Sequence, residues 1–247
     1  AFHKTLDVSS TTIEVDHRGN IIDVSAQLKG VLHNVSSLDT LIFTLNPGLN
    51  LLSVSDGSGN LVSYEREKQI IKIPFEKAHE QNDSLSYTFS YRGKINETFC
   101  YLDIAEDEFK QIRNVGPINL DKRFSFIEKD YIMLTPETFW YPTPGVGFNV
   151  YTLKTRRAYF SDYSVSVKTN PKYTVISQGT SDYSLPTNGL SLIVGEYDTL
   201  SVKVDSVDYN LFYVPGHDFF TAEFPNLKDT LAYIISDEKS RYDNANF

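Results

Sequence analysis

Residues 85–91 of the chain read Leu85-Ser86-Tyr87-Thr88-Phe89-Ser90-Tyr91. Large apolar side chains alternate here with small hydroxyl side chains. Because successive side chains of a β-strand point to opposite faces of a sheet, one face of this segment is predicted to be buried and the other to meet water. That alternation is typical of antiparallel sheets, which cover a core with one face only.

The same period-two alternation returns along most of the chain. It occurs at residues 22–28, 41–45, 71–73, 163–167 and 207–213. Turn-forming residues such as Gly19-Asn20 and Asn188-Gly189 stand between the alternating segments, and no spacing indicates strand–helix–strand units. The sequence therefore predicts an all-β fold, an antiparallel sandwich or a curved double sheet.

A different period appears near the C-terminus, after Pro225-Asn226. The apolar residues follow at spacings i, i+4, i+7 and i+8, and they are Leu227, Leu231, Ile234 and Ile235. This spacing predicts an amphipathic helix that begins at Pro225 or Asn226. We read it as the start of a second domain, with residues 1–204 as the sandwich and 205–247 as that start. We expect its apolar face to fold back on the chain or to dimerise.

Composition excludes several classes of protein. The 247 residues carry 23 Lys and Arg against 32 Asp and Glu, a net charge of −9, which argues against a nucleic-acid partner. A single cysteine, Cys100, excludes an internal disulfide and a multi-thiolate metal site. Because the one methionine is Met133, we expect the chain to be processed or taken from a longer protein.

Catalytic motifs are missing from the sequence. His79-Glu80 could begin the zinc motif H-E-x-x-H, but Asp83 stands where the second histidine is needed. No G-x-S-x-G elbow, P-loop or dinucleotide fingerprint occurs. We therefore expect no metal ligands and no catalytic residues in this chain.

The most unusual segment is residues 134–145, Leu-Thr-Pro-Glu-Thr-Phe-Trp-Tyr-Pro-Thr-Pro-Gly. It holds the one tryptophan and three prolines, which favour an ordered loop over a strand. Two interpretations stay open. Phe139, Trp140 and Tyr141 form either a stacking platform for a glycan or a protein partner, or an aromatic plug that closes one end of the sandwich.

The order of several segments resembles the N-terminal domain of the aminopeptidase N-like gluzincin peptidases. The likeness covers nearly the whole chain. It rests on residues 12–17, 21–28, 39–43 and 51–55, on residues 83–95 with their Tyr-x-Gly, on Trp140-Tyr141-Pro142, on residues 162–167 with Ser177-Gln178-Gly179, and on Gly195-Glu196-Tyr197.

The resemblance implies a saddle-shaped antiparallel β-sandwich followed by a zinc-dependent catalytic domain. Residues 209–247 look like the strand and helix that begin that second domain, and the H-E-x-x-H helix would lie beyond Phe247. The implied function is a non-catalytic domain that shapes the substrate cleft of a zinc metallo-aminopeptidase, a hydrolase. Its implied partners are its own catalytic domain and a peptide substrate, with zinc in the full-length protein only.

The resemblance also implies a substrate-binding site. Family members hold the free amino terminus of the substrate with a Glu or Gln just before the aromatic-Pro loop, and the nearest candidates here are Thr135 and Glu137, with Trp140 and Tyr141 beside them. The family's Gln-x-Glu-Pro pattern is not kept, and the Arg that often follows it is missing. This leaves open that Glu137 serves, that the parent protein cleaves differently, or that it is a catalytically dead scaffold.

Within the family, the Trp-Tyr-Pro-Thr-Pro-Gly loop and residues 101–104 resemble peptidase-like regions associated with bacterial ABC-type permeases. That likeness implies a permease partner and a location that is either membrane-associated or on the extracytoplasmic face of a bacterial cell. The alternative from another class is a stand-alone sandwich that binds glycans or proteins.

Overall fold

A computed structural model describes most of the chain. The described residues are 6–33, 39–75, 82–96, 114–115, 118–119, 125–146, 160–180, 186–204, 207–219 and 226–243. His79-Glu80, Cys100 and residues 101–104 lie outside them. The chain divides into two compact units, Ala1–Pro171 with Val175–Val194 and Lys172–Thr174 with Gly195–Phe247.

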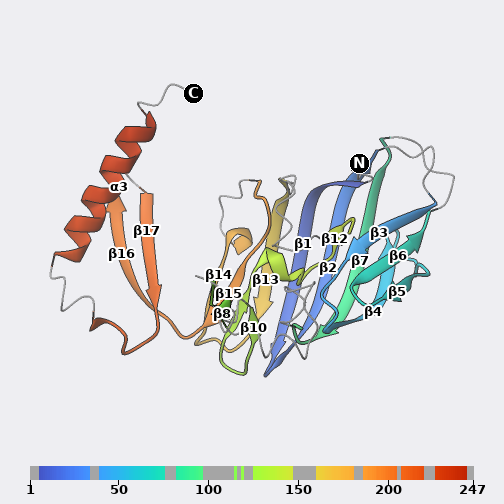
Figure 1. The fold of residues 1–247 in the computed structure, drawn as a ribbon, viewed down its shortest axis with the longest axis horizontal. Coiled ribbons are helices and arrows are strands. Elements are labelled where there is room, and N and C mark those ends of the chain that lie inside the picture. The colour runs from blue at the N-terminus through green and yellow to red at the C-terminus, as the bar shows by residue number, and fades with distance from the viewer. Residues whose placement is uncertain are drawn as a thin grey trace. The chain divides into compact units, whose positions relative to one another are not determined.

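The largest sheet of the first unit has five strands (Figure 1). Their order is β13 (Asp162–Lys168), β1 (Leu6–Arg18), β2 (Ile21–Leu32), β7 (Ser84–Gly93) and β4 (Leu49–Asp56). The pair β1–β13 is parallel and the other pairs are antiparallel. The segment 85–91 is the interior of β7, between β2 and β4, so the predicted strand is confirmed.

The alternation in β7 separates the two faces of this sheet as predicted. Phe89 and Tyr91 are 0% and 1% exposed, while the intervening Thr88 and Ser90 are half-buried. Phe89 pairs in register with Ala26 of β2 and Val54 of β4, which are both buried. One face of the sheet therefore forms the core.

A second sheet covers that core. Its order is β12 (Thr143–Pro144), β3 (Thr40–Thr44), β6 (Ile70–Pro74) and β5 (Glu65–Glu67). The ring of Phe43 in β3 meets that of Phe89 edge-on, with centroids 5.0 Å apart. This contact joins two apolar sheet faces and confirms the expected sandwich.

Two further sheets contain the strands β8–β11, β14 and β15. One has the order β10 (Phe126–Ile127), β11 (Ile132–Leu134), β15 (Leu192–Gly195) and β14 (Thr174–Ser177). The other pairs β8 (Asn114–Val115) with β9 (Ile118–Asn119). Short 3-10 helices follow β11 and β14, η3 (Pro136–Thr138) and η4 (Gln178–Thr180).

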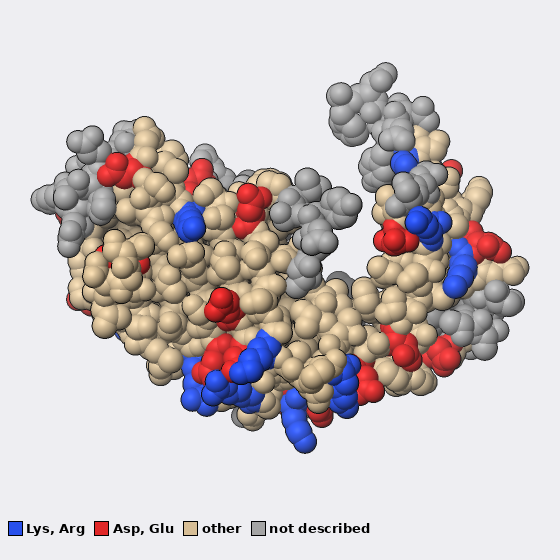
Figure 2. All heavy atoms as spheres, turned by 180° about the vertical axis from the view of Figure 1, so that it is seen from behind, with Lys and Arg blue, Asp and Glu red and all other residues tan. Residues whose placement is uncertain are grey.

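The outer face of the five-stranded sheet carries interspersed charges. Arg18 contacts Asp16 at 2.7 Å and Asp23 at 3.1 Å, and Asp23 contacts Arg92 at 3.3 Å. Figure 2 shows acidic and basic side chains lying next to one another on the face in view. These exposed ion pairs cross strands β1, β2 and β7 and add little to stability.

The second unit is a hairpin with a helix, β16 (Asp198–Val204), β17 (Val207–Tyr213) and α3 (Leu227–Asp243). The predicted helix is confirmed, and its first turn is closed by the amide of Thr230 bonding the carbonyl of Asn226 at 2.9 Å. α3 contacts β16, which corresponds to one of the two expected arrangements, but its apolar face is only partly covered, because Ile234 is 49% exposed. The boundary after residue 204 stays a prediction, although β16 and β17 pair across it.

Among the described residues, α3 and the other helical segments are too short or too polar to cross a membrane.

Candidate functional site

The segment that follows β11 is a short loop whose first turn is the 3-10 helix η3. Thr135 precedes it in an extended conformation, and its carbonyl accepts bonds from the amide of Thr138 at 3.1 Å and from the Thr138 hydroxyl at 2.7 Å. Pro136 opens the helix with its preset φ. Phe139 ends it in the left-handed region, at φ 51°. This turn carries the predicted site residues Thr135 and Glu137.

Trp140 holds the loop to the sandwich. Its side chain is 0% exposed, and its indole N–H donates to the carbonyl of Leu190 at 2.9 Å. Its own carbonyl accepts a bond from the Tyr91 hydroxyl at 3.0 Å. Burial raises the pKa of the Tyr91 phenol well above its ordinary value, because the charged form would lose its hydration. The loop is therefore tied both to β7 and to the segment before β15.

Tyr141 extends this anchoring. It is 6% exposed, and its hydroxyl accepts a bond from the amide of Leu190 at 3.1 Å and lies 3.4 Å from the hydroxyl of Tyr163. Its ring meets Trp140 edge-on at 5.1 Å and Tyr163 at 5.7 Å. Three aromatic rings in T-shaped contact add to the stability beyond their buried area.

The burial of these rings agrees with the interpretation of the loop as an aromatic plug. A stacking platform needs an exposed ring face, and Trp140 has none in the described structure. Substrate contact by Trp140 and Tyr141 stays a prediction. In the structure, the buried rings of Trp140 and Tyr141 pack directly after the turn that carries Thr135 and Glu137 and hold it against the sandwich.

Asn46 is a supporting residue that sequence reasoning missed. Its buried amide group donates to the carbonyls of Thr138 at 2.9 Å and Asn96 at 3.2 Å, and its oxygen accepts bonds from the amides of Gly48 at 2.9 Å and Asn96 at 2.8 Å. The backbone N–H of Asn46 also donates to the carbonyl of Phe139 at 2.8 Å. One side chain thus links the β3–β4 turn, the end of β7 and η3.

Arg66 of β5 also holds the backbone of Asn46. Its guanidinium donates to the carbonyl of Asn46 at 3.0 Å, to that of Lys68 at 2.9 Å and to that of Leu49. Burial lowers the pKa of Arg66. The Asn-Pro-Gly run around Asn46 signals a turn, but no sequence signal identifies a partner 92 residues away such as Thr138.

Glu137 and Thr135 are both half-buried, on the same turn. The amide of Thr135 donates to the Ser125 hydroxyl at 3.0 Å, and the two hydroxyls lie 3.4 Å apart. Pro136, between them, packs so closely on Gly189 that a Cβ at Gly189 would lie 2.8 Å from the Pro136 Cβ. Their role in substrate binding stays a prediction, and the structure fixes the backbone on both sides of Glu137.

The described residues do not fit a zinc site, because they contain no group of three or more His, Cys, Asp or Glu side chains that could hold a metal ion. We therefore assign no zinc-dependent step to the part of the chain that the structure describes.

Comparison with known proteins places the fold. No family model matches the chain, and no curated protein sequence matches it. Its fold is similar to the M1 zinc metallopeptidase of Deinococcus radiodurans, with a TM-score of 0.57 and 15% identity over 87% of this chain and 49% of that chain. Similar values, 0.57 and 15% over 86% and 49%, hold for a mutant of that enzyme bound to a Tyr-Ser-Ala substrate.

A two-domain M1 zinc metallopeptidase mutant bound to L-tryptophan is also similar, with a TM-score of 0.58 and 15% identity over 87% of this chain and 49% of that chain. The chain therefore spans about half the length of the structures it matches. At this identity the likeness shows the fold.

Proposed function

We propose that this chain is the N-terminal β-sandwich domain of a zinc metallo-aminopeptidase-like hydrolase, and that it shapes the cleft in which a peptide's amino terminus is held. The observation that carries the proposal is the likeness to M1 zinc metallopeptidases over 86% of this chain and about half of theirs. One of those structures holds a Tyr-Ser-Ala substrate and another an amino acid, which supports a peptide substrate.

The catalytic residues belong, in this proposal, to protein that follows residue 247. Residues 205–247 are then the start of that catalytic domain and residues 1–204 the sandwich. A zinc ion there supplies Lewis-acid polarisation of the scissile carbonyl and activation of water.

This chain's own contribution is Glu137. A carboxylate accepts strong, charge-assisted hydrogen bonds from a protonated amine, such as the free amino terminus of a peptide. The backbone on either side of Glu137 is fixed by η3, by Asn46 through Thr138 and by Gly189 against Pro136. Preorganisation of this kind lowers the cost of holding a substrate group in one place. Thr135, which caps the N-terminus of η3 on the same turn, offers a hydroxyl.

The test uses the protein continued past residue 247 and loaded with zinc, with leucine 4-nitroanilide as substrate. We expect turnover that a chelator removes. Glu137→Ala removes both the charge and the hydrogen-bond acceptors of the side chain, so KM should rise about tenfold or more. Glu65→Ala, on the edge strand β5, is the matched control and should leave KM unchanged.

Each outcome has a distinct meaning. Absence of turnover in the zinc-loaded longer protein would contradict the peptidase proposal and favour a catalytically dead scaffold. Turnover with an unchanged KM in Glu137→Ala would leave the domain assignment standing and remove the role of Glu137. A permease partner and a place at the extracytoplasmic side of a bacterial membrane stay predictions of the sequence.

A further inference from the structure

Asn188-Gly189 is the one Asn-Gly pair in the sequence, and it forms a bend between two bonded residues. Before the bend, Thr187 exchanges two backbone hydrogen bonds with Ser161, at 3.1 and 3.0 Å. After it, the amide of Leu190 donates to the Tyr141 hydroxyl at 3.1 Å. The pair therefore bulges from the surface between two fixed points of the backbone.

The reactive groups of this Asn-Gly pair are accessible. Asn188 is exposed, so water reaches its side-chain amide. The carbonyl of Gly189 accepts a bond from the Thr187 hydroxyl at 3.0 Å, but its amide N–H has no hydrogen-bond partner among the described residues. Because glycine has no side chain, nothing at Gly189 itself shields this nitrogen from the side chain of Asn188.

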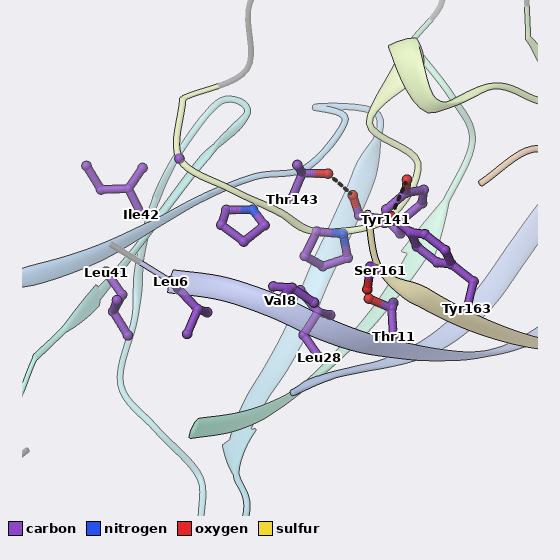
Figure 3. Close-up of a pocket in the computed structure, with 13 residues that line it drawn as sticks. Leu6, Val8, Thr11, Leu28, Leu41, Ile42, Tyr141, Thr143, Ser161 and Tyr163 are labelled. Carbon is purple, nitrogen blue, oxygen red and sulfur yellow. Dashed lines mark hydrogen bonds between the residues drawn. The ribbon is translucent and has the colours of Figure 1, made fainter. Parts of the chain in front are cut away.

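Gly189 also packs against the turn that carries Glu137. A Cβ at Gly189 would lie 2.8 Å from the Cβ of Pro136 and 3.6 Å from the hydroxyl of Tyr141. Figure 3 shows Tyr141 beside Tyr163, at a cavity that both residues line. A change in the backbone at Gly189 therefore acts directly on the two neighbours that hold this loop.

We infer that Asn188 is a site of spontaneous deamidation, and that its isoaspartyl product loosens the loop that carries Glu137. The nitrogen of Gly189 bonds to the side-chain carbonyl carbon of Asn188, and the bond from that carbon to the amide nitrogen breaks. The proton of the Gly189 N–H passes through water to the leaving nitrogen, which departs as ammonia. Water then opens the resulting succinimide ring at either carbonyl and gives aspartate or isoaspartate, without any oxidant, reductant or enzyme.

Isoaspartate lengthens the bend. It routes the main chain through the side-chain carbons, so one methylene is added before Gly189 and a free carboxylate remains beside it. Because interiors are close-packed, the added atom displaces Gly189 from Pro136 or draws Leu190 away from Tyr141. These residues all belong to the described first unit, so the inference is independent of the proposed peptidase function.

The first test incubates the full 247-residue chain in mildly alkaline buffer and follows each asparagine by peptide mass spectrometry. We expect Asn188 to deamidate faster than the exposed residues Asn20, Asn60 and Asn210, which precede Ile or Leu, because a branched side chain hinders ring closure. The rate should lie within about tenfold of that of the chain unfolded in urea, where the fold protects no residue. Asn188→Gln is the matched variant and should stay unmodified, because its ring closure would need six members.

The second test measures the loop in the isoaspartyl fraction. We expect amide hydrogen exchange at Leu190 and Phe139 to be about tenfold faster or more than in fresh protein, since their bonds to Tyr141 and Pro136 are weakened. Asn188→Asp is the control, because it carries the same charge on a main chain of unchanged length. It should exchange as the fresh protein does.

Slow modification of Asn188, at the pace of the asparagines before Ile or Leu, would overturn the inference. So would a rate in the folded chain more than tenfold below that in urea. If Asn188 does deamidate, unchanged exchange at Leu190 in the isoaspartyl fraction, or equally fast exchange in Asn188→Asp, would refute the loosening of the loop by a lengthened bend.

Discussion

The sandwich core and the hairpin β16–β17 share one sequence pattern but differ in burial. Leu41 in β3 and Phe89 in β7 are 2% and 0% exposed. In β17 the corresponding alternating residues Val207, Tyr209 and Leu211 are 49%, 38% and 41% exposed. Alternation thus identifies a strand, whereas burial also requires a second layer of enough area, which a two-stranded hairpin with one helix does not provide.

Aromatic residues show the same contrast. Trp140 in the loop is 0% exposed, while Tyr233 on α3 is 72% exposed. The loop is hydrogen-bonded to Tyr91 of β7, to Leu190, to Asn46 and to Ser125. By contrast, α3 contacts the strand β16. We therefore expect substitutions in the sandwich and its loop to lower the free energy of unfolding strongly, and substitutions in the β16–β17 hairpin and α3 to lower it little.

The largest effect is expected at Trp140. Trp140→Ala removes a fully buried ring and its bond to Leu190, and should lower the free energy of unfolding by about 4 kcal/mol. Tyr233→Ala is the control and should change it by less than ~0.5 kcal/mol. Urea unfolding followed by circular dichroism measures both, since the variant lacks the fluorescent residue. Similar losses in the two variants would break the comparison.

A leucine pair tests the strands directly. Leu41→Ala should cost about 3 kcal/mol, because its side chain is 2% exposed between two sheets. Leu211→Ala, at 41% exposure in β17, should cost less than ~1 kcal/mol. The same unfolding measurement applies. A cost at Leu211 equal to that at Leu41 would mean that β17 is covered in solution.

A pair of asparagines, one buried in the sandwich and one exposed in β17, extends the comparison to polar side chains. Asn46→Ala leaves the carbonyl of Thr138 and the amides of Gly48 and Asn96 without this partner and should cost about 2 kcal/mol. Its control is Asn210→Ala in β17, whose exposed side chain accepts one bond from Ser201 at 2.7 Å and should cost less than ~0.5 kcal/mol. Equal stability of Asn46→Ala and the parent chain would refute the bridging role of Asn46.

The smallest effect concerns pH. The side-chain hydrogen bond from Arg18, with the charges of Arg18 and Lys168, lowers the pKa of Asp16 below its ordinary 3.8. A lowered pKa in the folded state means that stability is present above pH 3.8 and is lost as the pH falls through the folded value. Melting temperatures of the parent chain and Asp16→Asn should therefore differ slightly near neutral pH and converge in acid.

Added salt provides the control for this prediction. About 1 M salt shortens the screening length to ~3 Å and should shrink the difference between the two proteins at neutral pH. A difference that grows in acid would contradict the assignment.

Much of the fold could be predicted from local pattern. The strand at residues 85–91 and the helix at Leu227 each repeat one period over several turns or pleats, so their type follows from which face must be buried. The parallel pairing of β1 with β13 could not be predicted, because it joins segments about 150 residues apart. Nothing local in either strand encodes that partner.

The candidate site was less accessible to sequence reasoning. Composition marked the loop around Trp140 as ordered, and the structure confirms an ordered, buried loop. The hydrogen bonds of the Asn46 side chain could not be predicted, because an Asn that only forms a turn and an Asn that also bonds distant segments have the same local sequence. The contacts of Arg66 with backbone carbonyls were missed for the same reason, since any backbone offers them.

Amide hydrogen exchange of the 247-residue chain tests the central claim most directly. The claim is that the loop that carries Glu137 is firmly held, while the described strands and helix of the second unit are largely exposed. Slow exchange is expected at Phe139, Gly145 and Leu190, whose amides donate to Pro136, Ile42 and Tyr141, and faster exchange along α3. Exchange at these three amides as fast as in α3 would contradict the account.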